Sequence, residues 1–203
     1  MRDSYSSFER RFLDRGRWLL HTLLKPAILL LAALRIPPDV ISVAQIGVGM
    51  VIVFTVTPYP RLTFLLFLLT LLLDSLDGAL ARHTGSALPF GALLDQFCDH
   101  VREVLVIAAL ARAGALSPFP AVLYAIAYPA LNLILFLCNT YQVPLPVALK
   151  SYLVVYPALF AYLWFGVNWL DGAVSLSVGL MALVVVQGLF HLRRGMREVP
   201  GEG

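Results

Sequence analysis

Four aspartates interrupt two long apolar segments of this 203-residue chain. Asp74 and Asp77 are three residues apart and Asp95 and Asp99 are four apart, so on helices each pair projects from one face. A charged aspartate costs about 3 kcal/mol at the centre of a membrane-spanning helix, which makes four of them a functional signal. If the two helices are antiparallel neighbours, the carboxylates converge, and divalent cations offset their repulsion. Oxygen-only ligands favour magnesium, manganese or calcium over zinc.

Small residues and one arginine follow the first aspartate pair. Gly78, Ala81 and Gly91 would let a ligand approach the helix backbone closely. Arg82 supplies a planar guanidinium, which binds phosphate through two parallel hydrogen bonds. A metal cluster, a cationic side chain and a surface of small residues together predict a pyrophosphate site. These residues by themselves indicate nothing further about the substrate.

The composition places these residues in a membrane protein. Hydrophobic residues make up 60% of the chain and charged residues only 13%, so lipid is the natural solvent for most of it. The net charge is +3, and arginines collect at both ends, which favours contact with anionic lipid headgroups over nucleic acid. The Arg-rich start predicts that no cleavable signal peptide is present. Cys98 and Cys138 lie in apolar segments without metal-ligand spacing and are expected in the core.

We predict an all-α integral membrane protein in which residues 1–203 form a single domain. An N-terminal amphipathic helix over residues 5–35 is expected to lie in the membrane interface, because Arg17, His21 and Lys25 line one of its faces. The alternative is a seventh spanning helix with snorkelling basic residues. Six transmembrane helices then form a bundle over residues 40–192, and each span has about the length that a bilayer requires: 40–57, 62–81, 90–111, 119–138, 147–165 and 173–192.

The number of spans sets the predicted orientation. Six crossings return the C-terminus to the side of the N-terminus, so both termini and the loops 83–89 and 142–146 are expected to be cytoplasmic. The two aspartate pairs flank the first of these loops. This arrangement puts the aspartate site at the cytoplasmic face of the cell's cytoplasmic (inner) membrane. The sequence leaves a homodimer open.

The segment from Asp74 to Arg82, followed by Gly91, Asp95 and Asp99, resembles the complete motif of the CDP-alcohol phosphatidyltransferase family, D-x2-D-G-x2-A-R-x8-G-x3-D-x3-D. All eight fixed positions match, so the signal is far more specific than that of a short motif. The preceding Pro-Asp-Val-Ile-Ser at residues 38–42 is similar to the family's Pro-Asn-x-Ile-Thr element, with differences at its second and fifth positions. The interfacial helix and six spans also match the family's architecture.

The resemblance implies an enzyme of phospholipid biosynthesis. Such an enzyme transfers a lipid-linked phosphoryl group from a CDP-linked lipid, such as CDP-diacylglycerol, to an alcohol and releases CMP. Asp74, Asp77, Asp95 and Asp99 would hold two divalent ions, Mg2+ or Mn2+, and Asp99 would also act as general base. The CDP pocket would be lined by Asp77, Gly78, Ala81, Arg82 and Gly91.

The alcohol acceptor is assigned from charge alone. Arg102 and Lys150 are expected to bind it, which favours a phosphorylated polyol such as glycerol 3-phosphate or inositol phosphate. The plainer alternatives are that Arg102 pairs with its neighbour Glu103 and that Lys150 anchors its helix to headgroups. The His-Val-Arg-Glu sequence after Asp99 matches neither the glycerophosphate nor the inositol-phosphate pattern of the family, and the Ser-Tyr-x-Arg-Ala-Arg-like segment of the inositol-phosphate branch is not found.

Other functions use similar residues. A divalent-cation transporter also carries intramembrane aspartates, and a structural ion-pair network or a non-catalytic scaffold could retain them. A conduit needs polar groups across the whole membrane, whereas the acidic residues here gather toward one face. The complete motif also disfavours the scaffold, because none of its residues has been lost.

Overall fold

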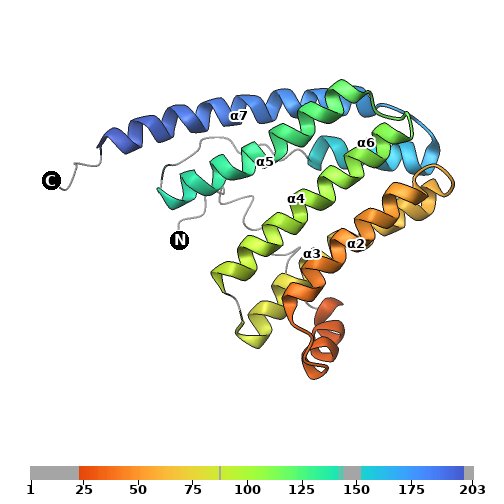
Figure 1. The fold of residues 1–203 in the computed structure, drawn as a ribbon, viewed down its shortest axis with the longest axis vertical. Coiled ribbons are helices and arrows are strands. Elements are labelled where there is room, and N and C mark those ends of the chain that lie inside the picture. The colour runs from red at the N-terminus through yellow and green to blue at the C-terminus, as the bar shows by residue number, and fades with distance from the viewer. Residues whose placement is uncertain (1–22, 87, 142, 144–151, 199–203) are drawn as a thin grey trace. The chain divides into compact units, whose positions relative to one another are not determined.

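The computed structural model describes residues 23–86, 88–141, 143 and 152–198. These residues form seven helices and no strand, which confirms the predicted all-α class. In chain order the helices are Leu23–Ala33, α2 (Pro38–Thr55), α3 (Pro60–Thr84), α4 (Pro89–Arg112), α5 (Pro118–Thr140), α6 (Tyr152–Phe165) and α7 (Leu170–Glu198) (Figure 1).

Proline and glycine set most helix ends. α2, α3 and α5 each have a proline in the first turn, where its missing N–H leaves no hydrogen bond unmade. Gly85 after α3 and Gly166 after α6 have φ angles of 67° and 73°, a backbone conformation that glycine adopts without strain. The helices accordingly begin and end close to the predicted spans. α7 is the main exception, because it continues beyond the predicted end at residue 192.

The helices fall into two compact units, and the first covers residues 5–109. Within it α2 and α3 run antiparallel, side by side (Figure 1). The short first helix covers their end, because Leu24 and Ile28 pack with Ile41 of α2 and with Leu76 and Leu80 of α3. Its described part would extend only about 16 Å at 1.5 Å per residue, which is shorter than a bilayer core.

Much of the predicted interfacial helix lies outside the described residues, including Arg17 and His21. Lys25, the third member of its expected polar face, is exposed. The choice between an interfacial and a spanning segment therefore stays a prediction.

The second unit comprises residues 110–203 together with 1–4. In its described part α5 and α7 lie side by side, and α6 also packs on α7 (Figure 1). α5 and α7 approach each other closely at Gly188, where an added Cβ would overlap Cγ2 of Ile134. Ile134, Cys138 and Leu192 form a small core at this point. Both cysteines of the chain are free and buried, as predicted.

Two polar contacts join the segment before α5 to the start of α7 and the residue Asn168 before it. The Asp171 carboxylate accepts hydrogen bonds from the Ser117 N–H and hydroxyl, both at 2.7 Å. The Asn168 side-chain amide donates to the Ala115 carbonyl at 2.8 Å. These bonds place the two segments at the same end of this unit, as the predicted alternation of spans requires.

Four of the described helices, α2, α3, α5 and α7, are long and apolar enough to cross a membrane. Only 28–33% of the residues in the most apolar stretch of each helix are buried. Large apolar side chains such as Phe54, Leu65 and Leu183 therefore face outward. A surface of this kind suits lipid rather than water. α4 is of similar length but carries Asp95, Asp99 and three further charged residues, whereas the described part of α6 is shorter.

Gly188→Ala should destabilise the second unit by about 1–3 kcal/mol, because Ile134 must move to admit the methyl group. Gly179→Ala is the matched control, since a Cβ at that position of α7 meets no atom within 4 Å. Thermal unfolding in detergent can be followed with a thiol-reactive dye, because both cysteines are buried. Equal melting temperatures for the two variants would contradict the close contact.

Candidate active site

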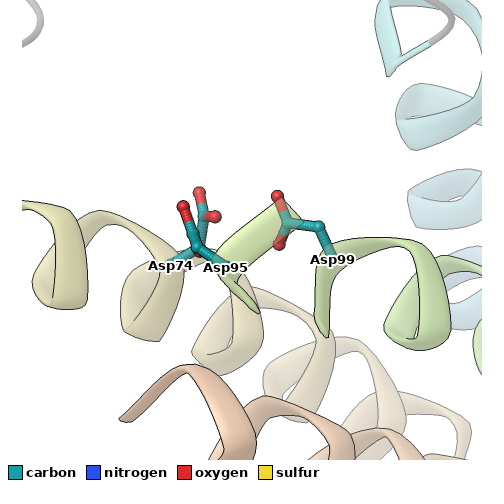
Figure 2. A group of neighbouring side chains, drawn as sticks. All are labelled: Asp74, Asp95 and Asp99. Carbon is teal, nitrogen blue, oxygen red and sulfur yellow. The ribbon is translucent and has the colours of Figure 1, made fainter. Parts of the chain in front are cut away.

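Three of the four aspartates converge between α3 and α4. Asp74 of α3 and Asp95 and Asp99 of α4 each offer a carboxylate oxygen, and these oxygens all lie within 4.8 Å of one another. Figure 2 shows the carboxylates of Asp74 and Asp95 projecting together, while that of Asp99, one helical turn along α4, points back toward them. The i, i+4 spacing on α4 produces this arrangement, because it puts both side chains on one face.

The cluster suits a hard divalent cation. All its donors are carboxylate oxygens, which Mg2+, Mn2+ and Ca2+ prefer. Oδ1 of Asp95 is buried and has no hydrogen-bond partner among the described residues. Three half-buried carboxylates so close together repel one another, and a cation between them would both offset that repulsion and satisfy the unpartnered oxygen.

Asp77 is held differently from the other three. Its side chain is 2% exposed, and Oδ2 accepts hydrogen bonds from the Ser42 hydroxyl at 2.6 Å and from the Gln45 amide at 3.3 Å. Both donors belong to α2, so this helix fixes the direction of the carboxylate. The Gly78 N–H donates to the other oxygen, Oδ1.

Sequence reasoning did not assign these partners on α2. A signal was present, because Asp39, Ser42 and Gln45 recur every three residues in an otherwise apolar span and therefore share one helix face. Only the packing of α2 against α3 shows that this face meets Asp77.

A cavity of about 200 Å3 opens beside Asp77. Its lining includes all five residues predicted to bind CDP: Asp77, Gly78, Ala81, Arg82 and Gly91. Pro38, Asp39, Ser42, Ser86, Leu88, Ala92 and Asp95 complete the wall. The cavity therefore joins the predicted nucleotide residues to the aspartate cluster.

The small residues shape this cavity. A Cβ added at Gly78 would lie 3.4 Å from Nη1 of Arg82, so the arginine side chain folds back over the glycine. At Gly91 an added Cβ would lie 3.5 Å from Oδ1 of Asp39, on the opposite wall. Arg82 is exposed, which leaves its guanidinium accessible to a ligand in the cavity.

Arg102 lies in the interior, beside the aspartate cluster. Its side chain is 4% exposed, and Nη1 lies 3.0 Å from Oδ1 of Asp99 while Nη2 lies 3.5 Å from Oε1 of Glu103. Nη1 also donates to Oε1 of Gln45 at 2.8 Å. Its expected role in acceptor binding stays a prediction, and so does that of Lys150, which lies outside the described residues.

The sequence model of the CDP-alcohol phosphatidyltransferase family matches residues 35–190, more than half of the chain. The chain therefore belongs to this family. The match contains all four aspartates, the residues that line the cavity and the face of α2 that contacts Asp77.

Local sequence similarity links the chain to two characterised synthases. It is 46% identical over 55 residues to the archaetidylinositol phosphate synthase of Aeropyrum pernix and 35% identical over 83 residues to the phosphatidylinositol phosphate synthase of Mycolicibacterium smegmatis. These alignments cover 27% and 39% of this chain but only 28% and 37% of the relatives' lengths.

Structural similarity extends further. The phosphatidylinositol phosphate synthase of Mycobacterium tuberculosis superimposes with a TM-score of 0.61 and 20% identity, both in its complex with manganese and citrate and with CDP-DAG bound. These matches cover 87% of this chain and 90% and 94% of the two structures. The protein thus has the helical fold of an integral membrane enzyme.

Asp95→Asn should raise thermal stability in the presence of chelator, because it removes one of the repelling charges and its amide can donate to a neighbouring carboxylate. Relief of roughly 1 kcal/mol corresponds to about 2–4 °C in a chain of this size. Added Mn2+ should then stabilise the wild type more than the variant. Melting curves with and without Mn2+, with sodium at matched ionic strength as control, measure both effects. A variant that is less stable in chelator yet shows an undiminished Mn2+ shift would contradict the metal site.

Proposed function

We propose that this protein transfers a phosphatidyl or related lipid-phosphoryl group from a CDP-linked lipid to a phosphorylated polyol and releases CMP. The observation that carries the proposal is one cavity that joins the carboxylate cluster to all five predicted CDP-binding residues. Family membership supports the same reaction class. The related Mycobacterium tuberculosis structures, one with manganese and one with CDP-DAG, support the metal and the donor.

In this proposal all four aspartates bind metal, and Asp99 also accepts a proton. Asp74, Asp77, Asp95 and Asp99 hold two divalent ions, Mg2+ or Mn2+, which supply positive charge that orients the diphosphate and stabilises the leaving CMP. Asp99 takes the proton of the attacking hydroxyl, because its carboxylate faces the cluster and is oriented by the ion pair with Arg102. Donor binding falls to Arg82, which is exposed at the cavity, and to the small surfaces of Gly78 and Gly91.

The bond changes balance without a further reactant. The acceptor oxygen attacks the phosphorus nearer the lipid and forms a new phosphodiester bond, while the bond from that phosphorus to the oxygen shared with CMP breaks. The proton moves from the hydroxyl to Asp99, and CMP leaves with the electron pair. Since the Arg-rich termini favour the cytoplasmic side, we place the site at that face of the membrane.

Among phosphorylated polyols we favour inositol phosphate. The two local sequence relatives are named as an archaetidylinositol phosphate synthase and a phosphatidylinositol phosphate synthase. Glycerol 3-phosphate is the competing acceptor, because the residues after Asp99 match neither branch of the family.

Asp99→Asn should lower the rate of CMP release at least about 100-fold, because proton acceptance is lost. CDP-lipid should still bind, since three carboxylates and the cavity remain. CMP release and direct binding of labelled CDP-diacylglycerol measure the two effects separately.

Chelation should abolish turnover of the wild type, and Mg2+ or Mn2+ should restore it. Unchanged turnover after chelation, or in Asp99→Asn, would argue against the mechanism.

Phosphorylated acceptors should react faster than their parent alcohols. We expect CMP release from CDP-diacylglycerol to be faster with inositol phosphate than with inositol, and faster with glycerol 3-phosphate than with glycerol.

Lys150→Ala should raise the acceptor's KM about ten- to hundredfold with little change in the donor's KM, as the loss of one charge-assisted contact implies. Lys25→Ala, at the chain's other lysine, is the matched control. Equal rates for phosphorylated and unphosphorylated acceptors would sink this assignment.

A further inference from the structure

Gln45 is a buried polar residue that the proposed reaction does not yet use. It lies in α2, its exposed fraction is 0%, and it contacts both helices that carry the aspartates. Its side-chain amide nitrogen donates to Oδ2 of Asp77 at 3.3 Å, and its Oε1 accepts a hydrogen bond from Nη1 of Arg102 at 2.8 Å. That same nitrogen of Arg102 lies 3.0 Å from Oδ1 of Asp99.

The chemistry of these contacts requires a side chain that both donates and accepts hydrogen bonds. A carboxylate only accepts hydrogen bonds and a guanidinium only donates them, so a residue between the two must do both. Glutamine is long enough and has one group of each kind. Its orientation is fixed by its partners, because turning the amide over would place an oxygen against Asp77 and an NH2 group against Arg102.

The position of Arg102 makes this link consequential. A guanidinium inside a carboxylate cluster competes with divalent cations for the same oxygens, since both are attracted to the same negative charge. Here one nitrogen of Arg102 is shared between the neutral carbonyl of Gln45 and the carboxylate of Asp99. The carbonyl, together with Glu103 at 3.5 Å from Nη2, therefore restrains the guanidinium beside the cluster.

We propose that Gln45 is a positioning residue for the metal site: its carbonyl restrains Arg102 so that Asp99 stays available to a cation, and its NH2 group orients Asp77. The inference rests on the proposed function only in taking the aspartate cluster as a metal site. It assigns no contact between Gln45 and either substrate.

Gln45→Met tests this role, because it preserves length and volume but removes both polar groups. We expect the Kd for Mn2+, measured by electron paramagnetic resonance on the purified protein in detergent, to rise about tenfold, the lower end of the range seen when a ligand's supporting partner is lost. Gln45→Glu restores an acceptor for Arg102 but places a carboxylate against Asp77, so its Kd should lie between the wild-type value and that of Gln45→Met.

Thr63→Val is the matched control. Thr63 is also buried, and its hydroxyl donates to Thr55, so the variant removes another polar contact between α2 and α3. Thr63 lies eleven residues before Asp74, about 16 Å along the helix. The Mn2+ Kd of this variant should equal that of the wild type even if its melting temperature falls.

A double variant, Gln45→Met with Arg102→Met, keeps the test decisive if Gln45→Met alone does not fold. Removing the competing guanidinium should return the Mn2+ Kd to the wild-type value or below it. A Kd that stays tenfold weaker in the double variant would overturn the restraint of Arg102 by Gln45, and a Kd for Gln45→Met that matches that of Thr63→Val would overturn the role of Gln45 as a whole. If Asp74→Asn leaves Mn2+ binding unchanged, the metal site itself fails, and the inference fails with it.

Discussion

The site depends on one physical constraint, the repulsion among carboxylates that two apolar helices bring together. Asp74, Asp95 and Asp99 approach within 4.8 Å in a setting where water screens them poorly. Folding alone does not favour such a cluster, so its presence points to a bound cation as the compensating partner. The carboxylate repulsion lowers the stability of the fold locally, and the proposed reaction depends on the same carboxylates.

The helix α2 supports this site through its contacts with Asp77 and Arg102. Ser42 and Gln45 hold Asp77, while Arg102 connects Gln45 to Asp99, so carboxylates from both aspartate helices are tied to one buried polar network. The hydrogen bonds of Ser42 and Gln45 and the ion pair of Arg102 with Asp99 restrain these side chains inside an apolar interior. A metal site needs such rigidity, because its ligands must keep a fixed geometry while the substrates enter and leave.

The helix surfaces around this polar network are apolar. Along the spanning helices many large apolar side chains point outward, where lipid replaces water as the solvent. α4 combines both environments, since Asp95, Asp99, Arg102 and Glu103 share a helix with many apolar residues. Length and hydropathy alone therefore do not mark the helix that carries two of the four aspartates as a span, although its place in the sequence between neighbouring spans and its length are those of a transmembrane segment.

Much of this protein could be predicted from the sequence because the information is local. Prolines, glycines and long apolar runs indicated the helices, and the spacing of Asp74, Asp77, Asp95 and Asp99 indicated their shared faces. The pairing of Gln45 with Asp77 and Arg102 was decided only by the tertiary structure. Gln45 is separated from these partners by 32 and 57 residues, and its role depends on which face of α2 packs against α3 and α4. Helical periodicity places Asp39, Ser42 and Gln45 on one face, but it does not say what that face will meet, because packing against other helices is a property of the folded chain.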